Sequence, residues 1–148
     1  MMTQGMSLIV KNTAKLVTGF IAVFGIYIAM TGHLSPGGGF AGGVILAAAA
    51  VLVILAFGRR GAKGLITDAQ CHAWDGAGAL AFAVVALCGY FSGQFFVNFI
   101  PRGKVHDLAS GGMIPLANLA ILVKVGAGLA GAFLALAAFR RLGMGKVA

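Results

Sequence analysis

Four long apolar segments constrain the fold of this chain more than any other feature of its sequence. Crossing the hydrocarbon core of a bilayer takes about 20 residues of helix. Segments of about that length are expected at residues 16–31, 40–57, 76–100 and 114–139. Residues 7–15 lengthen the first helix if they join it. The sequence therefore predicts one domain over residues 1–148, an all-α integral membrane protein with four transmembrane helices.

The composition supports this fold class and excludes others. Hydrophobic residues make up 60% of the 148 residues and charged residues 9%, whereas about 25% of an ordinary soluble domain is charged. The net charge of +8 does not indicate nucleic-acid binding, because the cations lie at the ends of apolar segments and form no basic stripe. Cys71 and Cys88 lie too far apart in sequence for a CxxC pair. We expect no disulfide, metal, cofactor or catalytic site in this chain.

The positions of the cations predict the orientation in the membrane, because positively charged loops stay in the cytoplasm. One side of the predicted topology carries eight cations, which are Lys11, Lys15, Arg59, Arg60, Lys63, Arg140, Arg141 and Lys146. The other side carries Arg102 and Lys104. We therefore expect a multi-pass protein of the cytoplasmic membrane with both termini in the cytoplasm. A cleaved signal peptide is not expected, since no small-residue cleavage pattern follows the first segment.

A glycine-rich run joins the first two predicted helices. Its glycines formally satisfy GxGxxG, but a dinucleotide fingerprint requires a soluble βαβ unit and an acid about 20 residues later. Proline ends the first helix and glycine permits unusual backbone angles. The run predicts a hairpin that either packs tightly or lines a polar cavity with irregular backbone. The hairpin residues are Pro36, Gly37, Gly38, Gly39, Phe40, Gly42 and Gly43.

Small residues recur at four-residue spacing in the later helices, which lets helix backbones approach closely in lipid. The pairs are Gly89 with Gly93, Gly126 with Ala130, and Gly128 with Ala132. They favour a subunit that packs against other membrane subunits. A compact, self-contained bundle is the alternative.

Lys124 is the only strongly charged residue within the four predicted apolar segments. Lying ten residues after Ile114, it is about 15 Å deep. A charge there costs at least about 2.5–3.5 kcal/mol and should have a partner. Asp75 is expected at the cytoplasmic end of the third segment and Asp107 in a loop, so a carboxylate from another subunit or a chain of waters is the expected partner. We interpret Lys124 as an ion-path candidate, with a structural ion pair as the alternative.

Two further polar residues are weaker ion-path candidates. His33 is expected at a bend near the membrane boundary, and histidine is a side chain that can exchange protons under physiological conditions. A hydrogen-bonded structural histidine is the alternative. Asn118 lies inside the fourth apolar segment and is expected to bond a neighbouring helix.

The segment Gly32–Gly43 resembles the GH-x-x-PGGGF-x-GG signature of the MnhB/MrpB subunits of multisubunit Na⁺/H⁺ antiporters. The segment Ser110–Gly128 is similar to the final-helix region of the same family. The resemblance implies a small accessory subunit of a heteromeric membrane complex, with Na⁺ and H⁺ as the transported ions. It implies partners among the other membrane subunits and the lipid bilayer.

Three functions are compatible with a small membrane protein of this kind. The main prediction is a non-catalytic subunit of a cation/proton antiporter module that forms or seals the ion path. The alternative is the equivalent membrane-arm subunit of a redox-driven complex, such as a membrane-bound hydrogenase or a sulfur reductase. A free-standing small exporter is disfavoured, because the chain has no Glu and no Asp is expected at mid-membrane depth.

Overall fold

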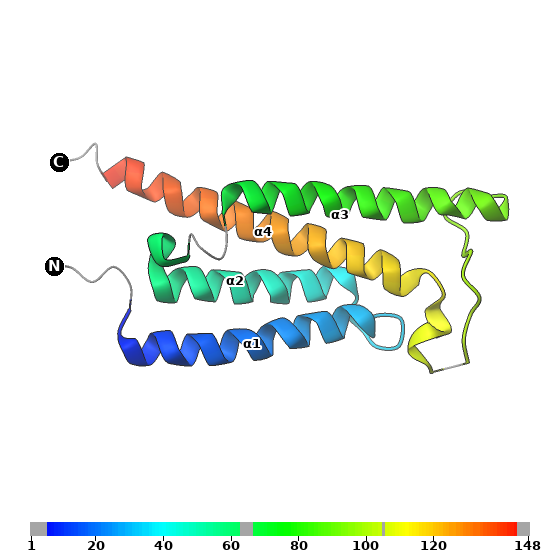
Figure 1. The fold of residues 1–148 in the computed structure, drawn as a ribbon, viewed down its shortest axis with the longest axis horizontal. Coiled ribbons are helices and arrows are strands. Elements are labelled where there is room, and N and C mark those ends of the chain that lie inside the picture. The colour runs from blue at the N-terminus through cyan, green and yellow to red at the C-terminus, as the bar shows by residue number, and fades with distance from the viewer. Residues whose placement is uncertain (1–5, 63–66, 105, 145–148) are drawn as a thin grey trace.

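The computed structural model describes residues 6–62, 67–104 and 106–144, and this part of the chain is built from helices and loops (Figure 1). The four long helices are α1 (Leu8–Met30), α2 (Gly39–Ala62), α3 (Asp68–Cys88) and α4 (Ile114–Met144). Two short 3₁₀ turns, η1 (Gly89–Ser92) and η2 (Leu108–Gly111), flank the connection between α3 and α4. All four long helices are long and apolar enough to cross a membrane. The predicted fold class is confirmed.

The ends of these helices follow from local residue chemistry. The Ser7 side chain accepts a hydrogen bond from the backbone N–H of Val10, so the turns at 7–15 do belong to α1. The helical stretch of α2 is interrupted at Gly58, whose φ of 71° lies in the left-handed region that glycine tolerates. The apolar part of α2 therefore ends there.

The expected bounds of the third segment, 76–100, are wrong by eight residues at both ends. The membrane-spanning region of this helix runs over Asp68–Ser92. A capping box fixes its start, because Thr67 accepts from the Gln70 N–H and the Gln70 side chain accepts from the Thr67 N–H. The left-handed backbone of Gly93 follows its end, with a φ of 96°.

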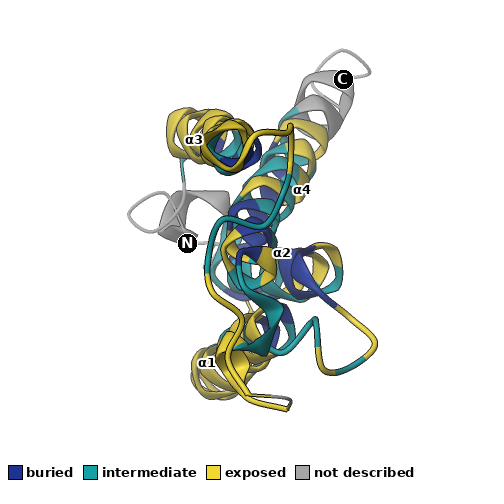
Figure 2. Cartoon of the chain, turned by 90° about the vertical axis from the view of Figure 1, so that its right-hand side faces the viewer, coloured by how far each residue is buried: buried dark blue, intermediate teal, exposed yellow. Residues whose placement is uncertain are grey.

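The helices alternate in direction and form a row in the order α1, α2, α4, α3 (Figures 1 and 2). The last helix in sequence thus lies between α2 and α3. The start of α1 and the end of α4 lie at one end of the molecule, and the α1–α2 and α3–α4 connections lie at the other. The two outer helices, α1 and α3, are largely exposed along their length (Figure 2).

The interior of the row consists mainly of small side chains. The buried hydrophobic residues are mostly alanines, and Ala29 is fully buried. At the α1–α2 crossing, a Cβ added to Gly25 would lie 2.9 Å from the Gly42 carbonyl oxygen. Such contacts let backbones pack directly, as close helix association in lipid requires.

Candidate functional site

An ion pair connects α3 and α4 inside the membrane-spanning region. The Nζ of Lys124 donates a hydrogen bond to Oδ1 of Asp75 across 2.9 Å. The expectation that no acid of this chain reaches Lys124 is therefore wrong. Asp75 lies seven residues after the first residue of α3, so it is about 10 Å into the helix at about 1.5 Å per residue.

The early start of α3 explains why the pair is hidden in the sequence. The first two turns of the helix contain Asp68, Gln70 and His72, and these polar residues delay the apolar signal. The capping-box pair Thr67 and Gln70 is the sequence feature that marks the true start. With the start moved to Asp68, Asp75 falls on the same membrane-spanning helix as the apolar residues that follow it.

Glycines on both helices bring the two charged residues together. A Cβ on Gly78 would lie 2.7 Å from the Lys124 backbone nitrogen and 2.9 Å from the Ala120 carbonyl oxygen. A Cβ on Gly128 would lie 3.5 Å from the Asp75 carboxylate. The missing side chain at Gly78 sets the distance between the helices, and Gly128 borders the carboxylate.

The remaining predicted small-residue pairs have different roles. Gly126 faces Leu46 of α2, and Ala130 is buried in a cluster with Ile54 and Leu134. The prediction of helix packing at Gly89 and Gly93 is wrong. Both lie beyond α3, and a Cβ on Gly89 would meet the backbone of the following turn, 2.6 Å from the Val97 nitrogen.

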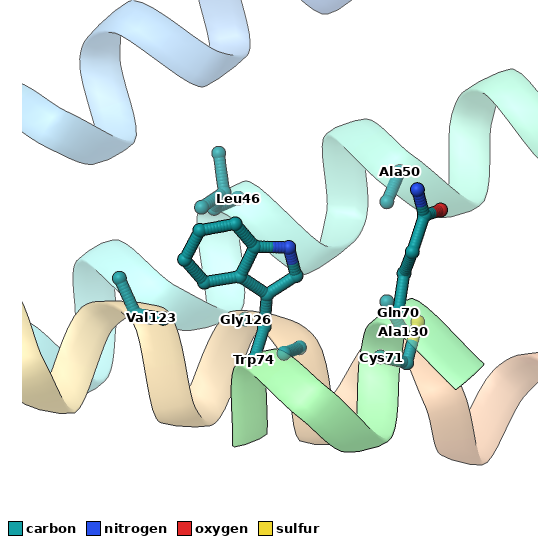
Figure 3. Close-up of a pocket in the computed structure, with 9 residues that line it drawn as sticks. Leu46, Ala50, Gln70, Cys71, Trp74, Val123, Gly126 and Ala130 are labelled. Carbon is teal, nitrogen blue, oxygen red and sulfur yellow. The ribbon is translucent and has the colours of Figure 1, made fainter. Parts of the chain in front are cut away.

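The ion pair is only half covered by this chain. The exposed side-chain fractions are 49% for Lys124 and 39% for Asp75. A cavity of about 410 Å³ lies between α2, α3 and α4 and is lined by Trp74, which precedes Asp75, and by Val123, which precedes Lys124. The Trp74 side chain extends toward Leu46 (Figure 3). Because successive helical residues are about 100° apart, Asp75 and Lys124 point away from this cavity and are not among the residues that line it.

The glycine hairpin packs tightly against α4. A Cβ on Gly39 would overlap the backbone of Asn118, and a Cβ on Gly32 would lie 2.8 Å from the Asn118 side-chain nitrogen. Gly38 has a φ of 92°, which a residue with a side chain rarely adopts. These contacts favour the tight-hairpin interpretation.

The residues of the hairpin divide into two groups by burial. Gly38, Gly39, Gly42 and Gly43 are buried, which fits their contacts with α1 and α4. The exposed members are Pro36, Gly37 and Phe40. Phe40 extends its ring away from the packed interior, with 65% of the residue exposed.

His33 lies at the end of the molecule that holds the α1–α2 and α3–α4 connections. Its Nε2 is 3.3 Å from the backbone oxygen of Asp107, while its Nδ1 is buried without a hydrogen-bond partner. A Cβ on Gly111 would touch the imidazole ring at 2.9 Å. The ring is thus held between the hairpin and the loop before α4.

The three ion-path candidates do not form one site. Asn118 faces the hairpin and Lys124 faces α3, although both belong to α4. His33 contacts Gly111, which lies 13 residues before Lys124 and thus about 20 Å away at the rise of a helix. Of the three, Lys124 has an acidic partner, Asp75, and the ion-path roles of all three stay predictions.

The four packed helices and their intramembrane ion pair define a polytopic membrane protein with a charged site between two of its helices. The chain belongs to the family of domains related to the MnhB subunit of Na⁺/H⁺ antiporters, whose family model matches residues 9–131. The resemblance seen in the sequence is thereby confirmed.

Individual relatives agree with this assignment. The chain is 33% identical over 131 residues to an uncharacterized protein of Methanocaldococcus jannaschii, covering 82% of this chain and 48% of that protein. It is 32% identical over 91 residues to a Na⁺/H⁺ antiporter subunit of Bacillus subtilis, covering 62% of this chain and 63% of that relative.

A solved structure also matches the fold. One chain of a membrane-bound sulfane sulfur reductase, an archaeal respiratory membrane complex, is similar with a TM-score of 0.72 and 32% sequence identity. The match covers 88% of this chain and 60% of that chain. The present chain therefore spans from about half to somewhat under two thirds of the length of these three relatives.

Proposed function

We propose that this chain is a membrane subunit of a multisubunit Na⁺/proton antiporter module, and that the Lys124–Asp75 pair borders the ion path. Its family membership supports the first part of the proposal. The half-exposed ion pair inside the membrane-spanning region supports the second part.

The partial exposure of the ion pair is the observation that supports an ion path beside it. An intramembrane charge is costly in contact with hydrocarbon, and even a paired lysine and aspartate need to be screened from lipid. This chain covers only about half of each side chain. Another subunit or a hydrated channel therefore covers the remaining half, which is where an ion path would run.

The geometry of the pair suggests how it would couple a cation to a proton. An incoming Na⁺ and the Lys124 ammonium compete for the same carboxylate of Asp75, because both are cations that bind carboxylate oxygen. When Na⁺ binds to Asp75, the ammonium loses its counter-charge and releases a proton from Nζ to a neighbouring water. When Na⁺ leaves, the amine takes up a proton and returns to the carboxylate.

The positions of the charged residues support one orientation of the subunit in the membrane. The first turns of α1 carry Lys11 and Lys15, at the end of the molecule where α4 ends. Lys15 is 5.5 Å from the centre of the Phe57 ring of α2. Lys63 and Lys146 lie outside the described residues. We place this end in the cytoplasm and the chain in the cytoplasmic membrane.

A second candidate function is the equivalent subunit of a redox-driven complex. The observation that favours it is the fold similarity to a chain of a sulfane sulfur reductase complex. Purification of the native complex separates the two candidates, since a redox-driven version brings hydrogenase or reductase subunits with it and an antiporter does not.

The substitution Asp75→Asn tests the role of the ion pair. It keeps the size of the side chain, removes the carboxylate and leaves Lys124 unpaired. We expect the assembled complex to lose at least tenfold of its Na⁺-dependent proton exchange, measured in everted membrane vesicles with a fluorescent pH probe.

The matched control is Asp68→Asn, the same substitution seven residues earlier, in the first turn of the same helix. It should leave exchange near the wild-type rate. Normal exchange in an assembled Asp75→Asn complex would contradict the proposed ion path.

A further inference from the structure

A polar cavity of about 450 Å³ lies at the end of the molecule that holds the α1–α2 and α3–α4 connections. It is far from the Lys124–Asp75 pair and has no part in the proposed ion path. The residues that line it are His33, Leu34, Arg102, Gly103, His106 and Ser110.

The charged and titratable groups of this cavity are basic. Arg102 contributes a guanidinium, whose fork of N–H donors matches the oxygens of a phosphate. His33 and His106 add two imidazole rings from two different segments of the chain. Ser110 adds a hydroxyl group. The Nε2 of His33 already faces the Asp107 carbonyl oxygen. The donors that suit an anion are therefore those of Arg102, His106 and Ser110.

The neighbouring groups strengthen this character. Lys104 is exposed two residues after Arg102. Asp107 is the acid of the same loop, and its backbone oxygen is 3.3 Å from the His33 ring, but Asp107 is not among the residues that line the cavity. No acidic side chain of the described residues takes part in this lining.

The loop that supplies these groups has a defined shape. His106 has a φ of 73°, an uncommon conformation for a residue other than glycine. The Gly103 N–H donates to the Ala109 carbonyl across 3.0 Å, and the Asp107 N–H donates to the Lys104 carbonyl across 3.1 Å. The loop therefore closes on itself and holds its basic residues at one place.

The cavity lies close to the ends of two membrane-spanning helices. α1 ends at Met30 and α4 begins at Ile114, so the loop lies just beyond the membrane-spanning helices. Large exposed aromatic rings gather in the same connection, as is typical of the interface between hydrocarbon and water. They are Tyr90, Phe91, Phe95 and Phe96.

From this combination, we propose that the cavity binds the phosphate headgroup of an anionic phospholipid. The basic groups provide the charge complementarity, and the exposed rings in the same connection are typical of a segment at the membrane interface. Arg102 provides the main phosphate contact, with His106 beside it. A lipid held there would fix the loop against the membrane surface.

Native mass spectrometry of the full chain tests the proposal. The protein is released from detergent micelles that contain equal amounts of phosphatidylglycerol and phosphatidylcholine, and the retained lipids are identified. We expect preferential retention of phosphatidylglycerol. The substitution Arg102→Gln should weaken that retention about fivefold, as expected for one cation near an anionic headgroup.

Two further variants keep the test decisive. Lys11→Gln, which removes a cation at the other end of the molecule, should retain the lipid preference of the wild type. His106→Gln keeps Arg102 and should show a smaller loss of phosphatidylglycerol retention. This variant provides the test if Arg102→Gln fails to fold. Circular dichroism and gel filtration establish the folding of each variant.

Several outcomes would overturn the proposal. Equal retention of both lipids by the wild type would exclude an anionic headgroup site. An unchanged preference in folded Arg102→Gln would place the lipid elsewhere. A site for a free anion would be indicated if millimolar inorganic phosphate displaced phosphatidylglycerol and if binding of the headgroup were unchanged after removal of the acyl chains.

Discussion

Lys124 and Asp75 show how the meaning of one residue depends on where a neighbouring helix begins. A lysine inside an apolar segment is visible in the sequence, and its need for a partner follows from the cost of an intramembrane charge. The identity of the partner does not follow, because the polar first turns of α3 shift its apparent start to Gly76. The chain supplies its own counter-charge once the helix begins at Asp68.

Substitutions of Lys124 distinguish a proton carrier from a fixed charge. Lys124→Ala should lower Na⁺-dependent proton exchange in membrane vesicles at least tenfold, because Asp75 loses the group with which Na⁺ competes. Lys124→Arg should fail as well, since arginine keeps its proton at physiological pH. Subunit levels are measured in parallel by immunoblot.

Two controls define what each result means. Lys11→Ala removes a lysine from the first turns of α1 and should keep normal exchange. Full exchange in Lys124→Arg would show that the lysine acts as a fixed positive charge, and full exchange in Lys124→Ala would show that it is only a structural contact. The double substitution Asp75→Leu with Lys124→Met should preserve folding, because an ion pair replaced as a whole is often tolerated, but it should abolish exchange.

At the scale of the helices, small residues determine which elements meet. Four apolar runs predict four helices, and hydrophobicity alone does not rank their possible pairings. The contacts made at Gly25, Gly39 and Gly78 select α1–α2, α2–α4 and α3–α4. The hairpin of Gly32–Gly43 was predictable from its proline and glycines, whereas its contact with Asn118 required the arrangement of α4.

A single added methyl group should reveal the importance of the hairpin contact. Gly39→Ala places a Cβ against the backbone of Asn118, which has no flexible end that can move aside. We expect the free energy of unfolding to fall by about 1–3 kcal/mol, as in other overpacked interiors. Thermal unfolding of the purified chain in detergent, followed by circular dichroism, measures the loss.

Gly76→Ala is the matched control for this prediction. Gly76 lies within α3, and a Cβ there meets nothing within 4 Å. Since alanine is a better helix former than glycine, this variant should be at least as stable as the wild type. Equal stability of the two variants would show that the hairpin tolerates the extra atoms and that its glycines are not required for packing.

At the scale of the whole molecule, the sequence predicted two features and left a third open. The apolar segments and the charged ends predicted four spans, with the start of the first helix and the end of the last on the same side, as the structure shows. The order α1, α2, α4, α3 was not predictable, because it depends on pairwise fit between helices that are all apolar. The similarity to subunits of membrane complexes favours a subunit of a larger assembly over a self-contained bundle.

Cysteine labelling tests the orientation of this row in the membrane. In a chain whose Cys71 and Cys88 have been replaced by alanine, a single cysteine is placed either at Lys104 or at Lys63. A membrane-impermeant maleimide added to intact cells should label position 104 and leave position 63 unlabelled until the membrane is permeabilised. The reverse pattern would show that the start of α1 and the end of α4 lie outside the cytoplasm.

The position of α4 between α2 and α3 has a consequence for the synthesis of the protein. Because helices leave the ribosome in sequence order, α3 enters the membrane before α4, its main packing partner, has been made. During that interval Asp75 has no lysine beside it, and α2 and α3 must stay far enough apart to admit one more helix. Until the last helix closes the row, this lone carboxyl group is therefore either protonated or sheltered by the insertion machinery or a neighbouring subunit.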